Sequence, residues 1–484
     1  MTATQRHWQD YRIVLATLLI YIVASLVTGS AQQARAMTPP SDTCYIYRLY
    51  LTDKQGSAHT LTQPHTFLSP RAIARRQRQH LRVDSTDLPV SARYTALIRQ
   101  RGYTLIGSSK WNNTLLVATP SPTAQAALQA FPFVREVRRV YAGTLTSAAE
   151  PPMSLQTDTL QPTPSNSYGQ AYAQLRQLGG DALHEAGFRG KGMLIAVVDG
   201  GFHNAQLIPA LRRARVSHVR DFVYPYRDNL FHLLDHGTKV FSCMAAVDSF
   251  RYVGTAPEAT YMLLRSEYGP TESLYEEDTW AMAVEYADSV GADLINASLG
   301  YALFDDDTTS HRHSDLDGHA TLISHTASLL ATKGILLVCS AGNAGHDSWK
   351  TLTPPADALQ VLTVGAVDAH GRHASFSSVG PTADGRVKPD VVACGVGTQV
   401  VTAQGCVRPM QGTSFATPVV CGLAACLWQA LPQCTATDII RIIQASAHRY
   451  AHPDSCYGYG LPHFGRAYQQ ATNSCKHKAT PSTN

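Results

Sequence analysis

The feature that most constrains this chain is a regular alternation of short apolar segments with longer helical patterns, which begins near Ala171. The apolar segments predict strands over residues 193–198, 260–264, 293–297, 335–340 and 361–367. The helical patterns cover residues 238–247, 280–290, 321–333 and 414–430. Strands that alternate with helices predict an α/β domain with a doubly wound, mostly parallel sheet flanked by helices. Such a sheet carries functional groups at the carboxyl ends of its strands.

A small α+β unit over residues 43–142 precedes that domain. Its patterns predict strands at 44–51, 103–106, 114–118 and 134–140, and helices at 71–76, 91–102 and 122–131. Ser69-Pro70 is a typical helix start. We expect a solvated helix face, rather than a nucleic-acid site, from Arg71, Arg75, Arg76 and Arg78. Residues 143–170 are rich in Thr, Ser, Pro and Gln and predict an exposed linker. The α/β domain then covers residues 171–470, and a polar tail follows at 471–484.

Residues 1–36 have the pattern of a secretory signal peptide. Arg6 and Arg12 form a weakly basic start, an apolar run extends from Ile13 to Val27, and Ala34-Arg35-Ala36 has the small-x-small pattern of a cleavage site. The run is shorter than the roughly 20 residues that a membrane-spanning helix needs. We therefore expect a secreted or periplasmic protein without a stable membrane partner. The alternative is a protein anchored to the membrane by an uncleaved signal.

The composition fits a large globular core. Of the 484 residues 44% are hydrophobic, and a formal net charge of +4 gives no reason to expect a nucleic acid as partner. The ten cysteines are an even number, which permits disulfides in an exported protein. Buried thiols are predicted in apolar runs, at Cys243, Cys339, Cys421 and Cys426. Two short-range pairs are candidate disulfides, Cys394 with Cys406 and Cys434 with Cys456, and no pair has zinc-type spacing.

Three residues stand where the predicted fold could use them for catalysis. Asp199 ends an apolar strand, just before Gly200 and Gly201, which let the chain turn sharply. His236 precedes a helix of small and apolar residues, and an imidazole can accept a proton near neutral pH. Ser414 begins a small-residue helix, whose N-terminus offers free N–H groups. Each residue also has a plainer interpretation, as a turn-capping Asp, a packing His or an N-cap Ser.

Two neighbours of Ser414 bear on the geometry of that helix start. Gly412 allows a substrate backbone to approach closely. Pro418 is compatible only with the first turn of a helix, so it should mark where the helix begins.

In the order Asp, His, Ser, these segments resemble the subtilase family of subtilisin-like (S8-type) serine proteases. His236-Gly-Thr resembles the histidine motif of the family, and residues 412–418, Gly-Thr-Ser-Phe-Ala-Thr-Pro, resemble its serine motif. Residues 293–300, 334–345 and 374–380 are similar to further family segments, and the resemblance covers residues 168–468. It implies a subtilisin-like fold and a secreted serine endopeptidase that acts on polypeptides and requires no cofactor.

The resemblance also implies a role for each site residue. Ser414 is expected to attack the scissile carbonyl, His236 to carry its proton and Asp199 to orient the imidazole. Asn343 is expected to donate its side-chain amide to the oxyanion. The substrate is expected to bind as an extended strand along Ser298, Leu299 and Gly300, with Ser340, Ala341 and Gly342 as one wall of the specificity pocket.

The chain departs from the family pattern at three places. Lys239 and Val419 stand where many members have His, but neither position belongs to the triad. Asp199 is followed by Gly200-Gly201, where Asp-Ser-Gly is commoner. This last departure removes part of the usual motif around the Asp199 carboxylate, but it does not point to another residue for the same role.

By position and size, residues 43–142 resemble the N-terminal prodomain of the family. This implies a proenzyme, in which the unit assists folding, inhibits the cleft of its own chain and is cut off within the linker. A permanent accessory domain is the alternative. The polar loop at 304–319 offers Asp315 and Asp317 as oxygen ligands. Calcium is a hypothesis for this loop, against an exposed loop that borders the cleft.

Two other functions could use the same residues. A subtilase fold could serve as a non-enzymatic binding module, which the presence of all four catalytic residue types argues against. An exported esterase could use the same triad, since acyl transfer is open to any such site. A fluorophosphonate label on Ser414 tests the first alternative, and a comparison of casein with short-chain esters tests the second. The natural substrate and its side-chain preference cannot be predicted from these motifs.

Overall fold

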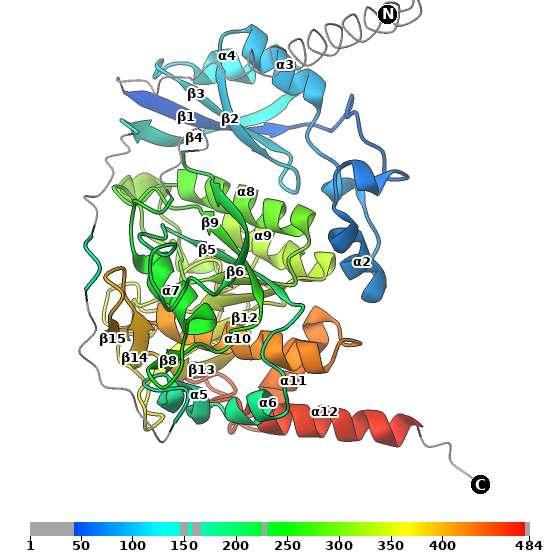
Figure 1. Ribbon diagram of the computed structural model, residues 1–484. Helices are drawn as coiled ribbons and strands as arrows, with labels where there is room; N and C mark the ends of the chain where they lie inside the picture. Colours follow the sequence, from blue (N-terminus) through cyan, green and yellow to red (C-terminus); the bar gives the residue numbers. More distant parts are fainter. Residues whose placement is uncertain (1–42, 146–152, 157–165, 225–229, 480–484) are drawn as a thin grey trace, which may run out of the picture. The chain divides into compact units, whose positions relative to one another are not determined.

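The computed structural model describes residues 43–145, 153–156, 166–224 and 230–479, with side chains to residue 473. The predicted signal peptide and the linker residues 146–152 and 157–165 lie outside these ranges. The α/β domain is built on a seven-stranded parallel sheet of order β13-β12-β11-β10-β5-β9-β6 (Figure 1). Its strands are β5 (Leu194–Asp199), β6 (Arg215–Asp221), β9 (Thr260–Arg265), β10 (Leu294–Ala297), β11 (Leu336–Ser340), β12 (Leu362–Val367) and β13 (Val391–Cys394). The predicted fold class is therefore confirmed.

Helices cover both faces of this sheet. Because side chains alternate along a strand, Ile195 and Val338 enter one core while Ala196 and Leu337 enter the other. Figure 1 shows α8 and α9 on one side of the sheet and α10 on the other. The helices of the domain are α5 (Tyr172–Gln177), α6 (Asp181–Glu185), α7 (His236–Ala245), α8 (Tyr275–Val290), α9 (Leu322–Leu330), α10 (Thr413–Ala430), α11 (Ala436–Ala445) and α12 (Phe464–Ala479).

The five strands predicted in this domain match β5, β9, β10, β11 and β12 to within one residue at each end. Among the strands, β6 and β13 at the sheet edges and two antiparallel pairs outside the sheet were not predicted. The pairs are β7 (Val247–Asp248) with β8 (Tyr252–Val253) and β14 (Val396–Val401) with β15 (Val407–Gln411). α12 continues to Ala479, into the segment predicted as a polar tail from residue 471.

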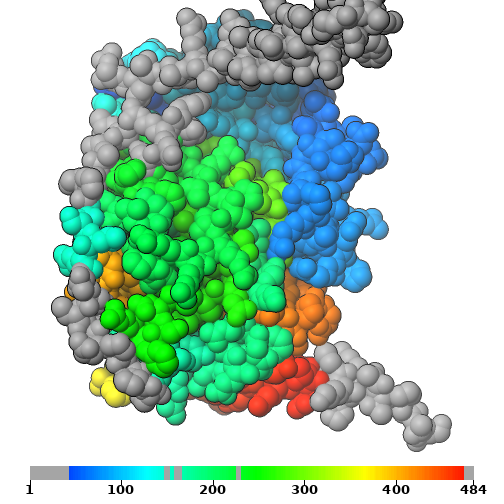
Figure 2. Space-filling model, in the orientation of Figure 1, coloured from blue at the N-terminus to red at the C-terminus, as the bar shows by residue number. Residues whose placement is uncertain are grey.

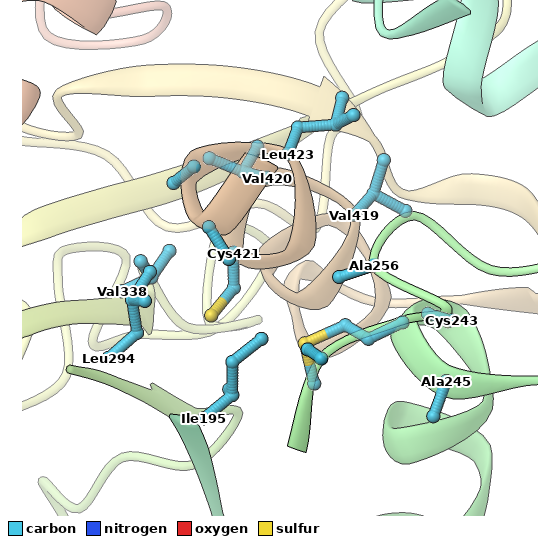
Figure 3. Packing of buried hydrophobic residues seen from close by; sticks show 14 of the residues in the cluster. Ile195, Cys243, Ala245, Ala256, Leu294, Val338, Val419, Val420, Cys421 and Leu423 are labelled. Carbon is cyan, nitrogen blue, oxygen red and sulfur yellow. The ribbon is translucent and has the colours of Figure 1, made fainter. Parts of the chain in front are cut away.

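Helix α10 is the central helix of one core. All of its residues from Thr413 to Trp428 are buried, and many are small, so the helix lies close to the strands. Figure 3 shows Cys421 pointing from α10 toward Ile195, Leu294 and Val338 of the sheet. Among the described residues, only α10 has the length and apolar composition of a membrane span, and 89% of that stretch is buried within the protein.

Pro418 does not mark the start of this helix, contrary to the prediction. Thr413 is the first residue of α10, which places Pro418 in the second turn. A proline there cannot donate to the carbonyl four residues earlier, which belongs to Ser414. That carbonyl instead accepts a hydrogen bond from Ser298 Oγ at 2.8 Å. The proline is tolerated because a side chain from β10's end supplies the missing donor.

The N-terminal unit has the predicted α+β character. Its antiparallel sheet has the order β2-β3-β1-β4, and Leu49, Ile98 and Leu128 belong to its own apolar core. Its elements are β1 (Cys44–Leu51), α2 (Pro70–Arg78), α3 (Ala92–Gln100), β2 (Thr104–Ser109), β3 (Thr114–Thr119), α4 (Gln125–Gln129) and β4 (Val134–Gly143). Ser69 caps α2 as predicted, because its side chain accepts the N–H of Ala72.

The prediction of a solvated arginine face on α2 is wrong for two of the four arginines. Arg75 and Arg76 are each 1% exposed and form ion pairs with Asp288 of α8. At the end of α2, Gln79 Oε1 accepts the N–H of Ala436, the first residue of α11. Figure 2 shows this blue segment in contact with the orange α11. The pattern of charges alone could not reveal that α2 packs against another part of the chain.

The thiol predictions have a mixed outcome. Cys243, Cys339, Cys421 and Cys426 are buried as predicted. The two candidate disulfides are not formed, since Cys394, Cys406 and Cys456 carry free thiols. Cys394 instead lies at the end of β13 with its Sγ near the hydroxyl of Thr398, at 3.7 Å. Closeness in sequence was a poor guide here, because the intervening hairpin does not bring the sulfur atoms together.

Candidate active site

Asp199 and His236 form a hydrogen-bonded pair at the carboxyl edge of the sheet. Asp199 is the last residue of β5 and is 1% exposed. His236 is the first residue of α7, and its Nδ1 lies 2.8 Å from Asp199 Oδ1. The same Oδ1 accepts the backbone N–H of Gly200 at 2.8 Å. The carboxylate is therefore held in place while it orients the imidazole.

The electrostatics of the pair favour a protonated imidazole. Partial burial of the ring opposes protonation, but the charge and hydrogen bond of Asp199 outweigh burial and raise the pKa of His236 to about 9. Asp199 Oδ2 is buried and has no hydrogen-bond partner among the described residues. A buried carboxylate with a free oxygen can stabilise a positive charge on the neighbouring ring.

Ser414 lies at the start of α10, on the same sheet edge as the pair. Gly412 precedes the helix with φ of 145°, a conformation that side chains other than glycine rarely adopt. Ser414 is 8% exposed, and Phe415 beside it lies against His236 with ring centroids 5.7 Å apart. In this structure the Ser414 hydroxyl donates to the carbonyl of Ser298 at 3.1 Å. Rotation about the serine Cα–Cβ bond is what redirects such a hydroxyl to another acceptor.

Asn343 is exposed just after β11, and Thr413 fixes its orientation. The backbone N–H and the hydroxyl of Thr413 both donate to Asn343 Oδ1, at 2.9 and 3.0 Å. With its oxygen engaged in this way, the amide keeps its N–H₂ group for another acceptor. Thr413 was missed at the sequence level, although it stands directly before Ser414 in the motif that was recognised.

The two predicted walls of the substrate cleft lie against each other. Ser298 to Gly300 follow β10, Ser340 to Gly342 follow β11, and Ser340 Oγ donates to the carbonyl of Leu299 at 3.4 Å. Thr353, also missed, fills the space between the glycines of the two walls. A Cβ placed on Gly300 or Gly342 would meet Thr353 Oγ1 at 2.3 and 2.7 Å. Only glycine fits at either position.

Glu267 is a further ionisable residue at this edge that the motifs did not reveal. It follows β9, the neighbour of β5, and is half-buried. Burial and the charge of Asp199 raise the pKa of Glu267 to about 7. Its Oε1 accepts from the hydroxyl of Tyr301 at 3.3 Å. The rule that functional groups follow parallel strands could have found it, since it lies two residues beyond Arg265 at the end of β9.

The loop proposed for calcium uses its carboxylates in local turns. Asp317 Oδ1 accepts the N–H groups of His319 and Ala320, both at 2.8 Å. Asp315 Oδ2 accepts the N–H of Arg312 at 2.8 Å. In the described part of the chain no three His, Cys, Asp or Glu side chains are grouped to hold a metal ion. Calcium binding stays a hypothesis for this loop.

Comparison with known proteins points to one family. The sequence model of the subtilase family, Peptidase S8, matches residues 190–460, and that of the Bacteroidota peptidase S8 propeptide domain matches residues 46–154. Subtilisin NAT from Bacillus subtilis subsp. natto is 30% identical over 59% of this chain and 68% of its own length. A thermostable alkaline protease from Halalkalibacterium halodurans is 33% identical over 59% of this chain and 70% of its own.

Solved structures have the same fold. The MycP1 protease from the ESX-1 type VII secretion system matches with a TM-score of 0.51 and 23% identity, over 67% of this chain and 93% of that one. The MycP3 protease from the ESX-3 system matches with a TM-score of 0.50 and 23% identity, over 66% of this chain and 97% of that one. At this identity the likeness concerns the fold alone.

Proposed function

The chain belongs to the subtilase family of serine endopeptidases and carries a propeptide domain, and from that premise we propose that Asp199, His236 and Ser414 are its catalytic triad. The observation that carries the proposal is the 2.8 Å contact between His236 Nδ1 and Asp199 Oδ1, on the sheet edge where Ser414 begins α10. Asn343 is proposed as the side-chain donor of the oxyanion hole. The reaction is hydrolysis of peptide bonds in polypeptides.

In the proposed mechanism Ser414 Oγ attacks the scissile carbonyl. For this the hydroxyl turns from the Ser298 carbonyl toward His236 Nε2, which takes its proton and later gives it to the leaving amine. Asp199 holds Nδ1 and stabilises the imidazolium. Water then attacks the acyl-enzyme by the same proton path in reverse, and Ser414 is regenerated.

The oxyanion that forms at the scissile carbonyl oxygen needs donors that are already in place. Asn343 offers its Nδ2, because Thr413 holds the amide by its oxygen. The backbone N–H of Ser414 is the proposed second donor, at the N-terminus of α10, where N–H groups have no partner within the helix. Loss of one such donor typically lowers kcat by about 10² to 10³. This value was obtained for the oxyanion-hole asparagine of subtilisin, a protein to which this chain is related.

The pH dependence of activity follows from the histidine. His236 can accept the serine proton only when neutral, and its raised pKa, about 9, keeps it protonated below that pH. We therefore expect kcat/KM to rise about tenfold per pH unit on the acid side and to level off near pH 9. A pH–rate profile on a neutral peptide measures this, and a plateau that begins near pH 6.5 would contradict the assigned role of Asp199.

The N-terminal unit is proposed to be an intramolecular inhibitor of a secreted proenzyme. The 2.8 Å hydrogen bond from Tyr268 to the carbonyl of Thr144, just after β4, supports this, since Tyr268 lies one residue beyond Glu267. Leu145 packs in the cluster that contains Leu299 of the predicted cleft wall. Thr144 and Leu145, which directly follow β4, thus lie against the α/β domain beside Tyr268. The predicted signal peptide supports export.

Substitution of the nucleophile tests the proposal. The active chain should bind a fluorophosphonate probe at Ser414, cleave casein faster than short-chain esters and release its N-terminal unit. Ser414→Ala should remove the label, lower proteolysis by at least about 10⁴ and leave the N-terminal unit attached. Ser314→Ala, which removes an exposed serine outside the site and keeps the nucleophile, is the matched control for the label. An unlabelled but folded wild-type chain would favour a binding module, and faster ester cleavage would favour an esterase.

A further inference from the structure

Glu267 occupies the space beside Gly200 that the serine side chain of the commoner Asp-Ser-Gly motif would fill. A Cβ placed on Gly200 would lie 2.7 Å from Glu267 Oε2. The chain has glycine at the position where serine is commoner in this motif, and a carboxylate from the neighbouring strand stands there instead. The substitution of glycine for serine and the presence of Glu267 are thus two parts of one local arrangement.

We propose that Glu267 determines specificity by binding a lysine or arginine side chain of the substrate, at the residue before the one whose carbonyl is attacked. The inference rests on the proposed function, because it takes His236 and Ser414 as the reacting groups. It gives this site a preference for basic substrate residues, which could not be predicted from the sequence motifs.

The order of strands along the sheet edge gives the position in the substrate. β10 lies between β11 and β5, and β9 lies beyond β5. A peptide that pairs with Ser298–Gly300 has the Ser340–Gly342 wall on one side and Asp199 with Glu267 on the other. Successive side chains of an extended strand point to opposite sides. When the side chain of the residue whose carbonyl is attacked occupies the pocket lined by Ser340–Gly342, the side chain of the preceding residue faces Glu267.

The surroundings of Glu267 suit a long cationic side chain. Tyr301 engages Oε1, while no donor is found for Oε2 among the described residues, and the side chain is only half-buried. The methyl groups of Leu234 line the same space, with Cδ1 3.1 Å from a Cβ placed on Gly200 and 2.9 Å from one placed on Gly269. A lysine stem can pack on Leu234 while its ammonium group reaches the carboxylate. A carboxylate at this place also repels acidic substrate residues.

Peptide pairs that differ in one residue test this with the mature enzyme. The probes are two series of peptides, Ac-Ala-Ala-X-Ala-p-nitroanilide and Ac-Ala-Ala-X-Leu-p-nitroanilide. In each series X is Lys, Gln or Glu. At pH 8.5, where Glu267 is ionised, we expect kcat/KM for Lys to exceed that for Gln by about tenfold. In Glu267→Gln the ratio should fall to within about twofold, and in Glu267→Lys the peptide with Glu should become the best substrate.

The readout is the ratio of kcat/KM for the Lys peptide to kcat/KM for the Gln peptide, measured with the same enzyme. A change in the pKa of His236 affects both values equally, so it cancels in the ratio. Glu272→Gln is the matched control, since Glu272 is an exposed carboxylate on the same loop. It should keep the preference for Lys. A wild-type ratio near one, a ratio that survives Glu267→Gln, or an equal loss in Glu272→Gln would overturn the proposal. If the peptide with Gln is not cleaved at all and Ser414 takes no label, it is the proposed function that fails.

Discussion

The two long helices that pack on opposite faces of the central sheet are buried in opposite ways. α10 is buried by its own domain, and its side chains between Thr413 and Trp428 are mostly small and apolar. α8 packs on its own domain through apolar residues and on the N-terminal unit through charged ones. Its buried residues include five carboxylates, Glu276, Glu277, Asp278, Glu285 and Asp288, and the last three of these hydrogen-bond the N-terminal unit. The α10 face of the sheet stays buried in the mature enzyme. The α8 face is covered by the N-terminal unit in the uncleaved chain and is exposed to water once that unit is removed.

The partners of the α8 carboxylates make this difference concrete. Asp288 is fully buried and is contacted by Arg75, Arg76 and Lys110, all from the N-terminal unit. Arg48 of β1 binds both oxygens of Asp278, each at 2.7 Å. An interface of paired charges loses little when its halves separate, because both halves are rehydrated. An apolar interface of the same size would leave an exposed apolar patch on the mature enzyme.

The largest effect is expected from removing the charge at the centre of the α8 face. Asp288→Asn leaves Arg75, Arg76 and Lys110 buried without their common partner. In the uncleaved chain, held intact by Ser414→Ala, we expect a loss of about 3–5 kcal/mol in the free energy of unfolding. In the mature enzyme, where Asp288 is on the surface, the change should stay within about 0.5 kcal/mol. Denaturant unfolding of both forms measures this, and equal losses in the two would refute the idea of a separable interface.

A cavity on the α10 face should behave in the opposite way. Leu423 is fully buried, and its methyl groups lie against Gly180 and Leu175. Leu423→Ala should cost about 3 kcal/mol, and the cost should be the same in the uncleaved and mature forms. Val420→Ala, a smaller truncation one turn away, provides a graded control. A cost confined to the uncleaved form would mean that this core, too, depends on the N-terminal unit.

The same contrast explains which features could be predicted from the sequence. Strands β5 and β11 are apolar up to their last residue and β10 is interrupted only by Asn296, so their hydrophobicity located them, and catalytic candidates follow from short motifs at the ends of β5 and β11. The burial of Arg75 and Arg76 could not be predicted, because an arginine pattern looks the same on a solvated helix and on one that meets a carboxylate face. Charged interfaces have no periodicity that distinguishes them from surfaces.

Within the site, the sequence indicated which residues matter but not how they are held. Thr413 orients Asn343, and Glu267 stands beside Gly200, yet neither residue departs from ordinary loop and cap composition. The carbonyl of Ser414 depends on Ser298 because of a proline four residues further on. Such contacts join segments that are far apart in the sequence, 70 residues for Thr413 and Asn343 and 116 for Ser298 and Ser414, and only the packed structure brings them together.

Acid should weaken the α8 face by a smaller amount than the loss of Asp288. Burial alone would raise the pKa of Asp288, but the charges of Lys110, Arg76 and Arg75 outweigh it and hold this pKa well below its usual range. A carboxylate with a lowered pKa stabilises the folded form above its unfolded pKa of about 4, and the contribution is lost as the pH falls below that value.

The uncleaved chain should therefore lose more stability between pH 5 and pH 3 than its Asp288→Asn variant. The comparison with the variant is needed because burial raises the pKa of Asp278 and Glu285 on the same helix, and these groups respond to acid with the opposite sign. Thermal unfolding at both pH values measures the difference. Parallel losses in the two proteins would exclude Asp288 as the acid-sensitive group.

The smallest effect is expected at the rim of the α8 face, from a residue of the same type on the same helix as Arg75. The Arg78 side chain is 42% exposed and contacts Asp293 at 3.2 Å, whereas Arg75 is 1% exposed. Arg78→Ala should cost less than about 1 kcal/mol in the uncleaved chain, because Arg78 is largely in water and the buried Asp293 keeps Arg71 and the N–H of Leu194 as partners. Arg75→Ala, three residues earlier, should cost about 3 kcal/mol or more, because Asp288 loses a buried partner. Both costs come from denaturant unfolding. Equal costs would show that α2 is held by its overall charge and not by which of its arginines are buried.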